Sequence, residues 1–225
     1  MRNIYIFFVF LFLLLSCSTN KEYVVRMHTT EGVIDLKLYN ETPKHRDNFV
    51  KLVKGHVLDS LIFHRVIKNF MIQGGDPTSK NAAPGELLGD GDLGYTIEPE
   101  FMPEKLFHRR GVLAAAREGD DVNPKQMSSA SQFYIVWGQV FTLEELRMYK
   151  ERYEKRMGRE INITPEQYEV YTTVGGTPHL DGWYTVFGEV IDGLEVVDSI
   201  QNMKCDKNDR PLTDVRILKV ELLKK

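Results

Sequence analysis

A guanidinium lies inside an apolar stretch of this sequence. FHRVIKNFMIQGGDP, residues 63–77, surrounds Arg65 with large apolar side chains and has a Gly-Gly pair near its end. An arginine is almost never fully buried without a partner, and no acidic residue follows Arg65 until Asp76. In an extended chain Arg65, Met71 and Gln73 would share one face, because alternate residues of a strand point the same way. The stretch therefore predicts an apolar pocket with one fixed cation.

Other chemical motifs are weaker in this sequence. GDGDLG, residues 89–94, has the glycine spacing of a dinucleotide-binding turn, but it leads into the strand-like YTIEP, so we interpret it as a flexible loop. The six histidines show neither HExxH spacing nor cysteine partners, so no metal and no cofactor are predicted. The sequence has no GxSxG elbow, the commonest signal of a serine hydrolase. His64, on an apolar segment, is interpreted as a satisfied structural histidine.

The elements around Arg65 are predicted to be mainly strands. Alternation in YVVRMHT and VIDLKLY predicts an antiparallel hairpin joined by a TEG turn. A helix follows, with Thr42 as N-cap, Pro43 at its first position and Gly55 as its stop signal. A brief helix is predicted at about 194–200, and further strands at 61–67, 112–116, 132–136, 184–191 and the final VRILKVELL. Many strands with few helices, and no repeated strand-helix-strand unit, predict an antiparallel barrel capped by helices.

Residues 141–176 interrupt this rhythm between two predicted strands. Thr142 and Glu145 form a capping-box pattern, and Thr164 with Gln167 marks a second helix start. The first helix carries an apolar stripe made of Leu146, Tyr149, Tyr153 and Met157. The segment therefore predicts an inserted helical hairpin, which is either a solvated ornament or a rim that selects substrates.

Composition narrows the class of protein. The chain has 225 residues, of which 42% are apolar and 27% charged, a balance typical of a folded globular domain. The formal net charge is -3, and the lysines and arginines are scattered along the chain. A nucleic-acid partner is therefore not expected.

The beginning of the chain has a different character. Arg2 precedes an unbroken apolar run over residues 4–15, which is short for a membrane span and the right size for a signal-peptide core. We interpret this segment as an export signal. A membrane anchor helix and a buried first helix are the alternatives.

The motif that ends this apolar run predicts a lipid anchor. LLSC, residues 14–17, resembles the lipobox of bacterial lipoproteins. The resemblance implies that residues 1–16 are removed as a signal peptide and that Cys17 is lipidated. Residues 17–22 would then be a short tether, and residues 23–225 would form one domain.

Four longer segments show a family resemblance. They are FHRVIKNFMIQGGDP, GVLAAAR (111–117), SSASQFYIV (128–136) and HLDGWYTVFGEVIDGLEVVD (179–198). In this order they resemble the cyclophilin type of peptidyl-prolyl cis-trans isomerase, over nearly all of residues 23–223 outside the insertion. The resemblance implies a closed eight-stranded antiparallel barrel with a helix at each end and the active site on its outer face.

The resemblance also implies a set of site residues. Arg65 matches the catalytic arginine, and Gln73 matches the amide that holds the substrate backbone. The other implied substrate-binding residues are Phe70, Met71, Arg117, Gln132, Phe133, Tyr134, Leu180 and Tyr184. Arg117 stands where asparagine is usual, Tyr184 where histidine is common, and His179 where cyclosporin-sensitive members have tryptophan. We interpret these departures as altered inhibitor and substrate preference, not as lost activity.

Function and location follow from these two resemblances as expectations. The first implies an isomerase that acts on proline-containing segments of exported proteins and assists their folding. A non-catalytic proline-binding chaperone module on the same fold is the alternative, although such a pocket would need neither Arg65 nor Gln73. A hydrolase using His64 or His179 lacks a nucleophile beside either ring. The second resemblance implies a lipid-anchored protein of the bacterial cell envelope, in the periplasm or at the outer membrane, with its domain outside the cytoplasm. We expect it to be a monomer.

Overall fold

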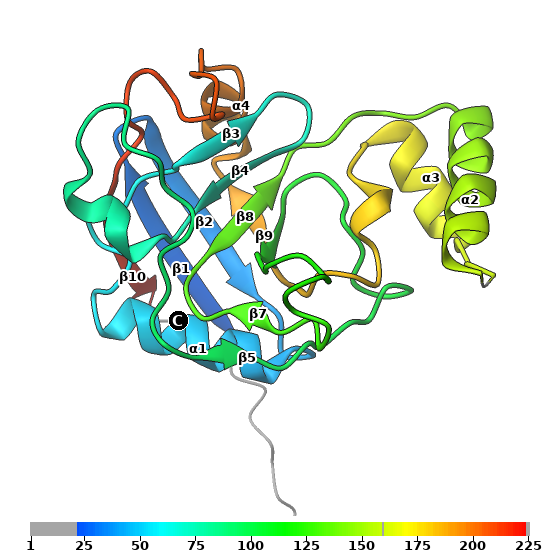
Figure 1. Cartoon of the computed structure of the whole chain (residues 1–225), viewed down its shortest axis with the longest axis horizontal. Helices are drawn as coiled ribbons and strands as arrows, with labels where there is room; N and C mark the ends of the chain where they lie inside the picture. The colour runs from blue at the N-terminus through cyan, green and yellow to red at the C-terminus, as the bar shows by residue number, and fades with distance from the viewer. Residues whose placement is uncertain (1–21, 159, 224–225) are drawn as a thin grey trace, which may run out of the picture.

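Figure 1 shows the chain as a computed structural model, which describes residues 22–158 and 160–223. In chain order its elements are β1 (Tyr23–Thr29), β2 (Gly32–Leu38), α1 (Pro43–Lys54), β3 (Arg65–Ile67), β4 (Met71–Gly74), η1 (Pro77–Asn81), β5 (Thr96–Ile97), β6 (Val112–Ala115), β7 (Ser128–Ser129), β8 (Phe133–Val136), α2 (Leu143–Met157), α3 (Pro165–Thr173), η2 (Pro178–Leu180), β9 (Val186–Asp192), α4 (Leu194–Gln201) and β10 (Ile217–Leu223). The elements labelled η are short 3-10 helices.

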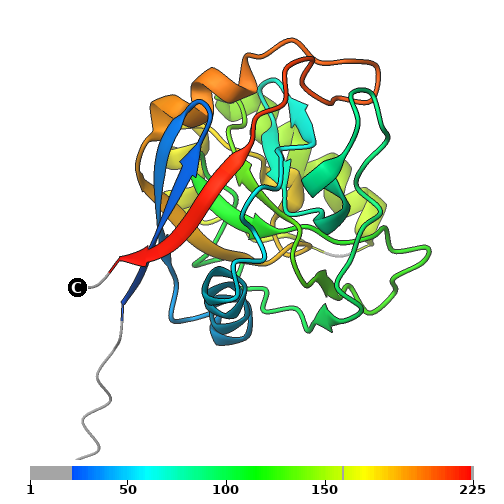
Figure 2. The same cartoon turned by 90° about the vertical axis from the view of Figure 1, so that its left-hand side faces the viewer.

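Eight strands form one antiparallel sheet in the order β10-β1-β2-β9-β6-β8-β4-β3. The sheet curls into a half-barrel (Figures 1 and 2). Its edges approach each other beside β3 and β10, where Phe63 N donates to Val215 O at 2.9 Å and Ile217 N donates to Leu61 O at 2.8 Å. The predicted mainly β, antiparallel fold class is confirmed. The predicted closure is not, because β3 and β10, the two edge strands, are not paired with each other as strands. The short strands β5 and β7 pair separately.

The inside of the half-barrel holds the main hydrophobic core. Helix α1 lies at one end and α4 at the other, as Figures 1 and 2 show. Burying a large apolar side chain contributes about 1.5–3 kcal/mol, so this core is the main force that keeps the sheet curled. Its members include Ile34, Leu36, Phe49, Phe63, Ile72, Phe133, Phe187, Val197 and Ile200.

Helix α1 begins at Pro43 as predicted, but Thr42 does not cap it with its side chain. Thr42 has φ -118° and ψ 65°, which is not the extended conformation of a capping residue, and its hydroxyl is buried without a hydrogen-bond partner among the described residues. The Glu100 carboxylate takes over this role from a distant loop. It accepts from Lys44 N at 3.1 Å and from His45 N at 3.0 Å, so an anionic group still satisfies the first turn.

The insertion is a pair of helices, as predicted. Both capping boxes are present, from Thr142 to Glu145 at α2 and from Thr164 to Gln167 at α3. Figure 1 shows α2 and α3 side by side on one flank of the half-barrel. The stripe of α2 faces inward: Leu146 packs with Phe107 and Tyr171, while Tyr149 stacks on Tyr153, whose ring meets Trp183 edge-on. The Met157 side chain lies outside the described part.

Within residues 22–158 and 160–223, no helix has the length and apolar character needed to cross a bilayer. The predicted signal peptide, residues 1–16, and the predicted lipidation site, Cys17, lie outside the residues that the structure describes. Of the predicted tether only Glu22 is described.

Candidate active site

Strand register places the central site residues in one row on the outer face of the sheet. Arg65 of β3 pairs with Gln73 of β4, Gln73 pairs with Tyr134 of β8, and Tyr134 pairs with Ala114 of β6. Residues that face each other across antiparallel strands project on the same side of the sheet. Met71 is two residues before Gln73 on β4, so Arg65, Met71 and Gln73 share one face as predicted. The extended stretch assumed for them was wrong, because a hairpin between β3 and β4 brings Arg65 opposite Gln73.

An apolar cluster lies beside this row. Its buried members include Met71, Tyr134 and Leu180, and partly buried Phe70 and Tyr184 pack against them. The Phe70 ring stacks on His179, with centroids 5.3 Å apart and planes 27° from parallel. Five of the residues implied by the resemblance thus lie together, next to the cation.

Arg65 is held by two contacts. Its Nη1 donates to Gln73 Oε1 at 3.3 Å, and its Nε lies 3.7 Å from Asp209 Oδ2. The Arg65 side chain is 43% exposed, so the guanidinium is at the surface of the site and not inside the core. Asp209 was not found from the sequence, because it is far from Arg65 along the chain and only the fold brings these two residues together.

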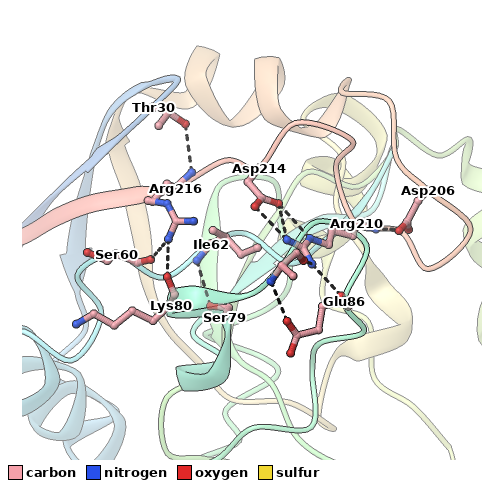
Figure 3. A network of polar contacts seen from close by, with 11 residues as sticks. Thr30, Ser60, Ile62, Ser79, Lys80, Glu86, Asp206, Arg210, Asp214 and Arg216 are labelled. Carbon is pink, nitrogen blue, oxygen red and sulfur yellow. Dashed lines mark hydrogen bonds and ion pairs between the residues drawn. The ribbon is translucent and has the colours of Figure 1, made fainter.

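The loop that carries Asp209 is fastened by two other arginines (Figure 3). Arg210 is buried, binds Asp214 through Nε and Nη2, and donates from Nη1 to Ala83 O at 3.0 Å and Glu86 O at 2.8 Å. Arg216 donates to the carbonyls of Ser60 and Lys80. Val66 N also donates to Asp209 O at 2.8 Å. These bonds hold the Asp209 carboxylate next to β3.

Gln73 continues the polar row toward a glycine-rich loop. Its Nε2 donates to Gln132 Oε1 at 3.1 Å, and Gln132 Nε2 donates to Gly89 O at 2.7 Å and Gly91 O at 2.8 Å. Asp76 Oδ2 accepts from Gly89 N at 2.6 Å. GDGDLG is thus a loop that leads into β5, as predicted. The prediction of a flexible loop does not include the hydrogen bonds by which Asp76 and Gln132 hold Gly89 and Gly91.

A groove of about 800 Å³ adjoins these two glutamines. The residues lining it include Gln73, Gln132, Arg117, Glu118, Asn123 and Ser129.

Arg117 borders the groove, but its guanidinium is committed to the protein. Its Nε donates to Trp183 O at 2.9 Å, its Nη1 lies 2.7 Å from Asp120 Oδ1, and its Cζ lies 4.6 Å from the Tyr184 ring centroid. The side chain is only 4% exposed. Arg117 therefore braces Tyr184 from behind.

Phe133 lies on the other face of β8 from its neighbours. Its ring meets Phe49 and Phe63 edge-on inside the half-barrel and is 1% exposed. Strand alternation in the sequence already indicates this orientation. In Gln132, Phe133 and Tyr134 the middle side chain must point to the opposite face from the other two. The structure does not bring Phe133 into the outer-face group.

Tyr134 has partners that were not found from the sequence. Its hydroxyl lies 2.9 Å from His108 Nε2, and His108 Nδ1 lies 2.9 Å from Asp181 Oδ1. Burial raises the pKa of Tyr134 well above its usual range, so the hydroxyl keeps its proton. The only sequence signal was that Asp181 follows Leu180 in the last family segment.

His64 is buried and weakly hydrogen-bonded. It is 3% exposed, and neither ring nitrogen has a hydrogen-bond partner of ordinary geometry among the described residues. Burial lowers its pKa to about 4, so the ring is neutral near pH 7. The prediction of a structural histidine agrees with this burial.

Known proteins share this sequence pattern. Residues 24–222 match the family model for cyclophilin type peptidyl-prolyl cis-trans isomerase/CLD. A protein of Staphylococcus haemolyticus (strain JCSC1435) named "Putative peptidyl-prolyl cis-trans isomerase" is 34% identical over 206 residues, which cover 90% of this chain and 92% of the relative. A protein of the same name from Staphylococcus aureus (strain USA300) is 36% identical over 204 residues, covering 89% of this chain and 92% of the relative.

Solved structures share the fold. A cyclophilin type peptidyl-prolyl cis-trans isomerase of Cryptosporidium parvum superposes with a TM-score of 0.66 at 26% identity, covering 91% of this chain and 99% of that one. A second structure of it, determined in the presence of the dipeptide Ala-Pro, gives a TM-score of 0.64 at 26% identity, with 90% and 99% coverage.

Sequence and fold together define the class of protein as an isomerase of X-Pro peptide bonds. The chain belongs to the cyclophilin-type peptidyl-prolyl cis-trans isomerase family.

Proposed function

We propose that this isomerase acts on proline-containing segments of exported proteins and assists their folding, from a lipid anchor on the bacterial cell envelope. The apolar run over residues 4–15 and the LLSC motif ending at Cys17 support export and anchoring. In this proposal the domain lies outside the cytoplasm, in the periplasm or at the outer membrane, and acts as a monomer. Proteins that fold in that compartment would be its substrates.

The chemical task is to lower a rotational barrier. Rotation about a peptide bond breaks amide resonance at about 18–20 kcal/mol, so uncatalysed X-Pro exchange takes tens of seconds or longer. In the twisted transition state the prolyl nitrogen becomes pyramidal and gains a lone pair. A donor directed at that nitrogen binds the transition state better than either planar ground state, and such differential binding accelerates the reaction.

Arg65 is the donor in this proposal. Its charge is permanent, so no proton has to be transferred, and its Nη1 contact with Gln73 Oε1 gives it a defined orientation. Gln73 holds the substrate backbone while the other side of the prolyl bond rotates. The observation that carries the proposal is the single row of Arg65, Gln73 and Tyr134 across β3, β4 and β8.

The apolar side chains beside the row would hold the proline ring. Met71, Tyr134 and Leu180 form one buried cluster, with Phe70 and Tyr184 at its edge. Such surroundings weaken the competition of water for the guanidinium. The relative determined in the presence of Ala-Pro supports a proline-binding role for this face.

An exchange assay tests the activity assigned to this site. The full chain, purified in detergent, should accelerate cis-trans exchange of a short X-Pro peptide and also a refolding step limited by proline isomerisation. A protein that suppresses aggregation of an unfolded client without accelerating either exchange would favour the binding-module alternative and contradict the catalytic proposal.

A further inference from the structure

A hydrogen-bond network of buried polar groups connects the pocket face to the insertion. The Tyr134 hydroxyl lies 2.9 Å from His108 Nε2, and the two rings stack with planes 14° from parallel. Asp181 Oδ1 lies 2.9 Å from His108 Nδ1 and accepts from His108 N at 2.7 Å. Asp181 Oδ2 accepts from the Tyr171 hydroxyl of α3 at 2.5 Å. Tyr134, His108 and Tyr171 are all buried.

The donors and acceptors of this hydrogen-bond network can be assigned. The Asp181 carboxylate accepts from His108 Nδ1–H. In the neutral ring Nε2 is then the accepting nitrogen, and the Tyr134 hydroxyl donates to it. Burial and the neighbouring Asp181 carboxylate raise the pKa of Tyr171 well above its usual range, so Tyr171 also remains a donor.

Two residues of the insertion contact the Asp181 carboxylate at one end of the hydrogen-bond network. Besides Tyr171, Gln167 of α3 approaches Asp181 Oδ2, with its Nε2 at 3.4 Å, and donates to Pro103 O at 2.9 Å. Gln167 is itself oriented by the capping box, in which its Oε1 accepts from Thr164 N at 2.9 Å. The Tyr171 ring is packed edge-on against Phe107. The polar contacts to Asp181 are thus set by the packing of α3.

One carboxylate therefore connects two walls of the pocket. Asp181 directly follows Leu180 in the chain, and through His108 it holds the hydroxyl of Tyr134. Both Leu180 and Tyr134 belong to the apolar cluster beside the row of Arg65, Gln73 and Tyr134. Breaking one bond in a buried network leaves a polar group without a partner, which disturbs the geometry of the remaining members.

We propose that His108, Asp181 and Tyr171 are positioning residues for the isomerase reaction, which fix the Tyr134 and Leu180 walls of the proline pocket and make α3 of the insertion part of the site. This inference rests on the assignment of the pocket made under the proposed function. The three residues act through the walls and do not touch the substrate. Their effect is on the binding of the proline ring, while the rotation step remains with Arg65.

The test is a set of single-hydroxyl variants in the full chain. Tyr171→Phe removes the bond to Asp181 and retains the ring, and is expected to raise KM for a short X-Pro peptide about threefold or more while kcat stays within about twofold. Tyr168→Phe is the matched control, because Tyr168 lies on the same helix and packs against the same small apolar cluster. A purely structural role for Tyr171 would lower the melting temperature without moving KM.

A double-mutant cycle tests whether Tyr171 acts on KM through Tyr134 or independently of it. Tyr134→Phe removes the other end of the hydrogen-bond network, so adding Tyr171→Phe to it should change KM little further. Losses that multiply would overturn the inference, as would equal KM values for Tyr171→Phe and Tyr168→Phe. If Tyr171→Phe fails to fold, Asp181→Asn, which keeps the side-chain shape, is expected to raise KM in the same way.

The parent measurement keeps the two proposals distinct. An inactive parent would overturn the catalytic assignment and this inference with it. An active parent whose KM is unchanged in Tyr171→Phe, or in Asp181→Asn where Tyr171→Phe does not fold, would overturn the inference alone.

Discussion

Arg65 Nη1 and Gln73 Oε1 are 3.3 Å apart across β3 and β4, and the amide group of Gln73 turns its other end to Gln132 Oε1 at 3.1 Å. A side-chain amide has one accepting and one donating end, so these contacts fix its orientation. The guanidinium has five N–H donors, more than its contacts with Gln73 and Asp209 use. It can therefore be held in place and still offer an N–H group to a substrate.

Replacing Arg65 by alanine should remove the donor for the prolyl nitrogen. We expect Arg65→Ala to lower kcat/KM for an X-Pro peptide at least tenfold, or about 1.4 kcal/mol of transition-state stabilisation. The fold should survive, because the side chain lies at the surface of the site. Lys68→Ala removes an exposed cation from the same segment and serves as the control. Equal kcat/KM values for parent and Arg65→Ala would contradict the mechanism.

His64 should make stability fall in mild acid. Its pKa is about 4 in the folded protein against a reference of 6.5, so the unfolded chain takes up the proton first. The contribution of the neutral ring is complete above pH 6.5 and decreases as the pH falls toward 4. Between pH 7 and pH 5 the loss should be about 2 kcal/mol in the free energy of unfolding.

Urea titrations of the parent and of His64→Leu at both pH values check this. The variant has no ring to protonate, so its stability should fall less over the same interval. Parallel pH dependence in the two proteins would show that another group is responsible.

Glu100 should stabilise α1 from outside the helix. Its carboxylate accepts from the backbone N–H groups of Lys44 and His45 and also lies 2.7 Å from His45 Nδ1. Glu100→Ala removes these contacts together and should lower the free energy of unfolding by at least about 1–2 kcal/mol, the effect of losing a capping residue. Glu98→Ala is the control, because Glu98 makes an exposed ion pair with Lys44 and should change stability by no more than about 1 kcal/mol. Chemical denaturation of both variants decides the question, and equal losses would refute the remote cap.

Cys17 should carry a lipid. Metabolic labelling of cells with a fatty acid is expected to mark the parent protein and not Cys17→Ala, and the variant should leave the membrane fraction. An unlabelled parent would refute the lipoprotein proposal without affecting the isomerase activity.

If the insertion is a rim that selects substrates, a protein client should contact its exposed side. Leu143 is 53% exposed and Met148 49%, whereas Tyr171 is buried, so changing the first two leaves the hydrogen-bond network at Asp181 intact. We expect Leu143→Ser combined with Met148→Ser to slow catalysed refolding of a proline-limited protein severalfold and to leave short-peptide turnover unchanged. Leu218→Ser, at an equally exposed 53% on β10, controls for lost surface apolarity. If both substrates respond alike, the selecting role should be abandoned.

Local signals predicted much of the fold, and contacts between distant segments account for what was missed. The capping boxes at Thr142 and Thr164 form because donor and acceptor are three residues apart. Alternation likewise placed Met71 and Gln73 on one face of β4, whereas Arg65 joins them through the register of the β3–β4 hairpin. Thr42 has the right residue type for a cap, yet a loop carboxylate took its place.

The missed site residues share a cause. Asp209 and His108 both come from loops without periodicity, and what places them is hydrogen bonding to other loops. Val66 N donates to Asp209 O, and Thr177 N donates to His108 O at 2.8 Å. No spacing rule within a single sequence reports such pairings.

The two oxygens of Asp181 bear on the order in which the molecule assembles. Oδ1 is bonded by His108, beside the curled sheet, and Oδ2 by Tyr171, in the insertion. A refolding chain whose strands have paired but whose helices α2 and α3 have not yet docked would have only half of this junction. Recovery of isomerase activity during refolding should therefore lag behind burial of the inner core, and the delay should lengthen when docking of the helices is slowed by Leu146→Ala.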